Sequence, residues 1–165
     1  MTSLDLGDLF TSFTRTAWRL EALQFYDEGP DEDPQMVAFL AGKPIPPRDD
    51  TSWLDLVSEH KKAGRQVSRV RVVERPLSTY VQFELAVYAE NIAAGEDVRV
   101  VEADDLAGVA PFPEFWLFDG EVVAIMRYDE DGVFLGADKA DHIEPYLAIR
   151  DAAVAASVAF DDFRS

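Results

Sequence analysis

The chain has 165 residues, 48% of them hydrophobic, which is typical of one globular domain and not of a disordered segment. It contains no cysteine, so disulfides, cysteine nucleophiles and thiolate metal sites are excluded. Its 32 acidic and 15 basic residues give a net charge of −17, and a surface this acidic repels phosphate backbones. We therefore expect a single domain over residues 1–165 that does not bind nucleic acid directly.

Neither the N-terminal residues nor the apolar runs carry a membrane or export signal. The first residues lack the basic and apolar segments of a signal peptide, and every apolar run is short and interrupted by charges. We expect no membrane association and a cytoplasmic location.

The first third of the chain predicts three helices and one strand. Leu and Phe at helical spacing predict a helix over residues 4–15. Apolar and charged residues alternate over 17–23, which indicates a strand, although the same residues could extend the helix. An Asp-Pro pair starts a short helix over 34–41, which a glycine ends. Another helix is predicted from about residue 50 to Gly64.

A strand–helix–strand unit follows. A valine-rich strand is predicted over 67–73, a long helix capped by Ser78 extends to about residue 93, and a second strand covers 97–101. A unit of this kind pairs its strands in parallel through a right-handed crossover.

The last third predicts an antiparallel meander and a helix. A loop rich in Asp, Gly and Pro covers 102–113. Asp-Gly pairs, which are strong hairpin signals, separate the predicted strands 114–118, 121–127 and 133–137. A capping-box variant at residue 141 starts a helix that runs to about residue 159.

The order of these elements predicts an α/β (α+β mixed) fold. We expect a mixed sheet of about six strands, with a parallel βαβ half followed by an antiparallel meander and with helices packed on the sheet.

No motif assigns a catalytic or cofactor site. His60 and His142 are the only histidines, no spacing links them, and both are expected to be exposed or to cap a helix. Residues 129–132 look like the start of a calcium loop, but apolar residues occupy the later ligand positions, so a hairpin turn is expected. The chain has no G-x-S-x-G, phosphate-loop or G-x-G-x-x-G motif. We expect no metal and no cofactor.

The site prediction rests on the order of the elements. Ligands of parallel sheets bind beyond the carboxyl ends of the strands, near helix N-termini. Charged residues on neighbouring strands and on the following helix could form a semi-buried network at this edge, either as a ligand or catalytic site or as structural ion pairs. The ligand-binding candidates are Arg19, Glu21, Arg71, Glu74, Arg75, Ser78, Tyr80 and Glu84.

An aromatic stretch forms a second candidate surface. Alternation puts Phe115 and Leu117 on one face of a strand and Trp116 and Phe118 on the other. Such a strand is either buried on both sides or presents one aromatic face to a partner, so Trp116 and Phe118 are interaction candidates.

Several stretches together resemble an actinobacterial protein family of unknown function. They are residues 17–21, 69–77, 80 with 83–84, 91–99, 115–119, 128–129, 134–137 and 150–151. Genes of this family often lie beside helix-turn-helix regulators, so the resemblance implies a small accessory protein of a regulator and supplies no catalytic residues. More distantly, the element order is similar to half of a phospholipase-D-like fold, but the catalytic motif is incomplete, because His60-Lys61-Lys62 matches its H-x-K half and Val67 stands where it needs Asp.

The sequence supports three hypotheses of function. The first is a non-enzymatic regulatory or ligand-sensing protein that acts through a partner such as a helix-turn-helix regulator, with a small-molecule ligand as a further expectation. The second is a small enzyme with an acid–base or anion-binding site around Arg19, Glu21, Arg71 and Glu84. The third is an acidic mimic of DNA.

Overall fold

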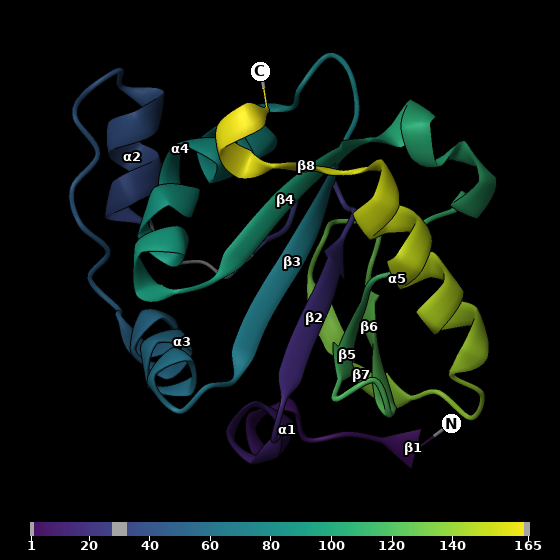
Figure 1. The fold of residues 1–165 in the computed structure, drawn as a ribbon. Helices are drawn as coiled ribbons and strands as arrows, with labels where there is room; N and C mark the ends of the chain where they lie inside the picture. Colours follow the sequence, from purple (N-terminus) through teal and green to yellow (C-terminus); the bar gives the residue numbers. More distant parts are fainter. Residues whose placement is uncertain (1, 28–32, 164–165) are drawn as a thin grey trace.

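A mixed sheet forms the centre of the protein (Figure 1). The computed structural model describes residues 2–27 and 33–163. Within them the strands are β1 (Thr2–Ser3), β2 (Thr16–Glu21), β3 (Gln66–Val73), β4 (Asp97–Glu102), β5 (Phe115–Phe118), β6 (Val122–Tyr128), β7 (Phe134–Lys139) and β8 (Val158–Ala159). The helices are α1 (Leu6–Ser12), α2 (Pro34–Leu40), α3 (Ser52–Lys62), α4 (Thr79–Ala94) and α5 (Glu144–Ala156), with 3-10 helices η1 (Ala103–Val109) and η2 (Phe160–Asp162).

The eight strands lie in the order β1-β7-β6-β5-β2-β3-β4-β8. Strands β2, β3 and β4 are parallel, and β5, β6 and β7 form the antiparallel meander. The two halves join where β2 pairs with β5 in antiparallel orientation. The predicted α/β fold, with a parallel half, a meander and helices packed on the sheet, is confirmed.

The two faces of the sheet have different cores. Under α5 and η1 the core is apolar, and it comprises Trp18, Leu20, Val70, Val72, Val101, Leu106, Phe115, Leu117, Val123, Ala140 and Ala153. On the opposite face, Phe13 and Val57 pack with Ala17, Trp116 and Phe118 beneath α1 and α3. On that second face charged side chains of β2 and β3 lie between this cluster and α4. Helix α2 packs on the outer side of α4 (Figure 1).

Local side-chain contacts set the helix boundaries. Asp5, Asp33 and Ser78 each accept a backbone N–H from the first turn of the helix that follows, as N-caps do. Gly95 ends α4 in the left-handed region at φ 115°. The last helix differs from the prediction, because its N-cap is Ile143 and makes no side-chain cap bond, so the predicted capping box is wrong.

The sheet has eight strands where about six were predicted. The two additional strands, β1 and β8, have two residues each, which is too short for an alternating pattern to be recognised. Residues 158–159 were predicted to extend the last helix, but that helix ends at Ala156 and Val158 pairs with Val100. The segment predicted as a loop over 102–113 contains the η1 helix. None of the described helices is long and apolar enough to cross a membrane.

His60 is buried, so the prediction that it is exposed or capping is wrong. Its Nε2–H donates to the Phe10 carbonyl at 2.7 Å, and its Nδ1 accepts from Arg65 Nε at 2.7 Å. The ring therefore joins α3 to α1. His142 is exposed, as predicted.

Candidate functional site

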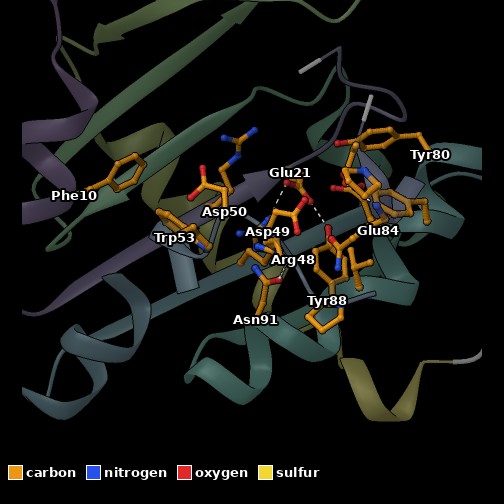
Figure 2. Close-up of a pocket in the computed structure, with 18 of the residues that line it drawn as sticks. Phe10, Glu21, Arg48, Asp49, Asp50, Trp53, Tyr80, Glu84, Tyr88 and Asn91 are labelled. Atoms are coloured by element: carbon orange, nitrogen blue, oxygen red, sulfur yellow. Dashed lines mark hydrogen bonds and ion pairs between the residues drawn. The ribbon is translucent and has the colours of Figure 1, made fainter. Parts of the chain in front are cut away.

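A pocket of about 570 Å³ lies over the sheet face that carries Arg19 and Glu21 (Figure 2). Side chains of β2, β3 and β5 form its floor, and α4 forms one wall. Phe10 and Trp53 line it from α1 and α3, and the 47–50 segment with the start of α2 lines its rim. Part of the sheet face that no helix covers is therefore open to small molecules.

The floor is built from arginine–glutamate ion pairs. Arg69 pairs with Glu21 at 3.0 Å and with Glu96 at 2.9 Å. Arg71 pairs with Glu84 at 2.7 Å and lies 3.8 Å from Glu21. The register explains this proximity, because Glu21 and Arg71 are opposite each other on paired parallel strands. Such buried pairs stabilise only when further hydrogen bonds satisfy them.

Glu114 holds the remaining arginine of the floor. Its Oε1 accepts the backbone N–H groups of Ala22 and Leu23 at 2.7 and 2.6 Å. Its Oε2 accepts from Arg19 Nη2 and from the Tyr26 hydroxyl, both at 2.8 Å. With four donors the carboxylate is fully satisfied, so the guanidinium of Arg19 is fixed in one orientation.

One amino group of Arg19 is left without a partner. Its Nε donates to the Leu20 carbonyl and its Nη2 to Glu114 and the Tyr128 hydroxyl. Within the described residues Nη1 makes no hydrogen bond, and it is not among the polar atoms sealed from solvent. The Arg19 residue is only 6% exposed, and it lines the pocket. Its free N–H groups are therefore directed to the pocket, where a ligand oxygen would satisfy them.

Two carboxyl groups of the floor have pKa values shifted in opposite directions. Burial alone would raise the pKa of Glu21, but Arg69, Arg71 and Arg19, with a hydrogen bond from Tyr88, lower it to about 2. Burial and the neighbouring Glu21 charge raise the pKa of Glu84 well above 4.5, although Arg71 opposes them. Glu21 is therefore ionised, and Glu84 keeps its proton to higher pH than an ordinary glutamate.

The charge count agrees with a protonated Glu84. The floor and the groups behind it contain three arginines and four glutamates, namely Arg19, Arg69, Arg71, Glu21, Glu84, Glu96 and Glu114. With Glu84 neutral, three positive charges face three negative charges. The ionised Glu21 beside it favours the protonated form of Glu84.

A second hollow of about 210 Å³ adjoins the first. The two share Arg19, Glu21 and Tyr80, and Tyr128 and Phe134 line the smaller one. Arg19 therefore lies at the junction of two spaces that differ in size.

Aromatic rings form one end of the larger pocket. The Phe10 ring centroid lies 5.2 Å from that of Trp53 and 5.0 Å from that of Trp116, in edge-to-face contacts. The Arg19 guanidinium carbon lies 5.8 Å from the Trp116 ring centroid. Trp116 and Phe118 are 4% and 2% exposed, so they form core and pocket floor, and the alternative of an exposed interaction face is wrong.

The rim carries carboxylates that form no ion pair with another described residue. Asp33, Asp49 and Asp50 line the pocket, and no ion pair between described residues includes any of the three. The neighbouring Arg48 is engaged elsewhere, by Glu90 and Asn91. Among the described residues no group of three or more His, Cys, Asp or Glu is arranged to hold a metal ion.

Residues 4–165 match a protein family described as a domain of unknown function, DUF6879. The chain belongs to the DUF6879 family. No curated protein matches it. The family description assigns no activity, so any function of this DUF6879 domain has to be argued from the site itself.

The structure brings together part of the predicted site. Arg19, Glu21, Arg71 and Glu84 form the pocket floor or lie directly behind it, and Tyr80 lines both hollows. The other three candidates line neither hollow. Ser78 caps α4 and donates its hydroxyl to the Gln24 carbonyl at 2.6 Å, Arg75 pairs with Glu102 at the surface, and Glu74 is exposed.

Several residues of the DUF6879 site were not predicted. Arg69 could have been found, because it is two residues before Arg71 on the same strand and therefore shares its face. Glu96 and Glu114 have no local signal, since one follows a helix and the other precedes a strand. Asp49 and Asp50 belong to an irregular segment whose course no sequence pattern indicates.

Proposed function

We propose that this DUF6879 protein is a non-enzymatic, ligand-sensing regulatory protein. It binds a small polar organic molecule in the pocket over β2 and acts through a protein partner, such as a helix-turn-helix regulator. The observation that carries the proposal is a pocket whose floor holds Arg19 in a fixed orientation with an amino group free for a ligand. Pre-oriented polar groups in a concave site are characteristic of ligand recognition.

The chemistry of the floor favours binding over catalysis. A general base works best when its pKa is near the operating pH, and the Glu21 pKa of about 2 makes it a weak base. The pKa of Glu84, the natural proton donor, is raised by burial and by the charge of Glu21, so its proton is held more tightly than that of an ordinary glutamate. Among the described residues no serine, cysteine or histidine lines the pocket, so it has no Ser–His or Cys–His pair of the kind that activates a nucleophile.

A small enzyme remains the second candidate, because two carboxyl groups with separated pKa values line one pocket. Such pairs occur where one group is an acid and the other is a base. Mass spectrometry of a bound ligand before and after incubation with the protein separates the two candidates. Conversion of the ligand that is lost in Glu84→Gln would establish an enzyme and refute the sensor.

The partner surface is expected beside the smaller hollow. Phe25, Phe134 and Leu135 are exposed, and Phe134 lines that hollow. Phe25 lies close by, because a Cβ at Gly132 would be 3.2 Å from its ring. The adjacent turn is acidic, and the chain carries −17 overall, so the partner surface suits a basic protein with apolar anchors. Ligand contacts at Arg19 would then be next to the partner.

The test is purification of the tagged protein from its native host. We expect a helix-turn-helix regulator in near-equal amount, lost in Leu135→Glu and retained in the control Val154→Glu, which changes another exposed apolar residue, on α5. A regulator that is retained in both variants would refute this surface. The absence of any regulator would refute the partner. Screening the purified protein against a broad panel of metabolites by thermal denaturation tests the ligand, and no saturable stabilisation by any compound would refute ligand sensing.

A further inference from the structure

We propose that the pocket recognises a zwitterion with an aromatic ring, of the kind represented by an aromatic amino acid. The inference rests on the proposed ligand-binding function and specifies the class of ligand. Three features of one pocket carry it: an unsatisfied donor, unpaired carboxylates and an aromatic end.

The donor requires an anionic or strongly accepting group on the ligand. Arg19 Nη1 makes no hydrogen bond within the described residues, although the rest of its guanidinium is held by Leu20, Glu114 and Tyr128. The Tyr128 hydroxyl accepts from Arg19 Nη2 at 3.2 Å, so its own hydrogen can be donated to a ligand. Tyr128 lines the adjoining smaller hollow, so a guanidinium and a hydroxyl meet at the junction of the two hollows, which suits a carboxylate placed there.

The rim favours a cation, because its three carboxylates are exposed at the mouth of the pocket. Asp49 and Asp50 line the same pocket and have no ion-pair partner among the described residues, and Figure 2 shows them between Trp53 and Glu21. Asp33 adds a third carboxylate from the N-cap of α2. An amine on the ligand would be attracted by these charges and by the negative field of the whole chain.

The combination excludes simpler ligands. A simple anion would gain Arg19 but would be repelled by the rim and by the net charge of −17. A simple cation would leave the Arg19 amino group unsatisfied when the ligand displaces water from it. A zwitterion satisfies both ends without changing the charge of the site.

The remaining contact is aromatic. Phe10, Trp53 and Trp116 line the pocket with ring centroids within 5.0–5.6 Å of one another, and Arg19 lies over Trp116. A ring placed here would contact aromatic edges and faces while its carboxylate reaches Arg19. The pocket, at about 570 Å³, is within the usual range of small-molecule sites.

The experiment is calorimetric titration with three matched compounds. L-tryptophan carries both charges, tryptamine lacks the carboxylate, and indole-3-propionate lacks the amine. We expect tryptophan to bind at least about tenfold more tightly than either analogue, which corresponds to one charge-assisted hydrogen bond.

Variants assign each charge to its residues and leave the ion pairs of the buried floor in place. Tyr128→Phe is expected to weaken tryptophan and indole-3-propionate but not tryptamine. Asp49→Asn with Asp50→Asn is expected to weaken tryptophan and tryptamine but not indole-3-propionate. Glu130→Gln, an exposed change outside both hollows, is the control and should leave all three affinities unchanged.

Equal affinities for the three compounds, or variants that weaken the binding of all three equally, would overturn the proposal that the ligand is a zwitterion. Failure of all three compounds to bind would overturn it as well. If the metabolite panel nevertheless contains another compound that stabilises the protein, the sensor proposal stands and only the ligand class fails. If no compound binds, both fail.

Discussion

Replacing the two carboxyl groups of the pocket floor one at a time tests whether Glu84 carries the proton. Glu84→Gln keeps an acceptor for Arg71 and supplies an N–H where the protonated acid would donate to Glu21. We expect this variant to lose less than about 1 kcal/mol of unfolding free energy, because it replaces one neutral donor with another. If Glu84 is neutral, Glu21→Gln instead leaves the three arginines of the floor facing only two ionised carboxylates, those of Glu96 and Glu114.

The loss in Glu21→Gln follows from the charge it removes. Glu21 is held by Arg69, by Arg71 and by the Tyr88 hydroxyl, and its side chain is 9% exposed. Removing one member of a buried pair typically costs about 3–5 kcal/mol, because the other charge is left uncompensated. We therefore expect the free energy of unfolding of Glu21→Gln to be several kilocalories per mole lower than that of Glu84→Gln. Urea unfolding followed by tryptophan fluorescence measures both.

The pH dependence of the same pair gives a second measurement. The folded-state pKa of Glu84 is raised, so the stability it contributes is complete below its unfolded pKa and is lost as the pH rises through the folded value. Gln does not titrate, so Glu84→Gln should become more stable relative to the wild type as the pH rises from the unfolded pKa of 4.5 toward the raised folded pKa. Equal losses in Glu84→Gln and Glu21→Gln, or a constant difference across this range, would refute the protonated Glu84.

Three further predictions concern stability. The folded-state pKa of Glu21 is lowered from 4.5 to about 2, so the stability that it contributes is present above pH 4.5 and is lost as the pH falls to about 2. Urea unfolding at a series of acidic pH values should show the free energy of unfolding decrease by about 3 kcal/mol over this range, and Glu21→Gln should abolish that decrease. Asp119→Ala should cost about 2 kcal/mol in urea unfolding, because this carboxylate accepts three backbone N–H groups at the entry to β2, and an unchanged midpoint would contradict that role. Gly95→Ala should lower the thermal midpoint more than the control Gly42→Ala, since both have positive φ but only Gly95 would bring a Cβ to 2.9 Å from Lys61; equal shifts would count against the steric argument.

Local patterns predicted most of the fold. The alternation around Trp18 and Leu20, the valine-rich third strand and the Asp-Gly turns were sufficient for six of the strands, because each spans several residues and has its own period. The strands β1 and β8 were missed because two residues carry no period. Their existence depends on which strand edges the fold leaves open, which is a long-range property.

The candidate site was predicted only in part, for a related reason. Arg19 and Glu21 alternate with buried apolar residues, and their position identified a charged strand face. The partners that give this face its chemistry come from distant segments, as with Glu114, which is 95 residues from Arg19. The sequence contains no information on strand order that would bring such residues together. For the same reason Arg75 and Ser78 were predicted in the site although they serve other contacts.

The pairing of β2 with β5 also has a consequence for the order of folding. Contacts between β2, β3 and α4 can form early, since they belong to one parallel unit, but Arg19 acquires Glu114 and Tyr128 only after the meander has docked. Contacts of such long sequence separation form slowly, because closing the intervening loop costs entropy. The ligand recognition proposed at Arg19 would thus require the completed chain. A fragment that ends before β5 would fold its parallel half at best and bind nothing there.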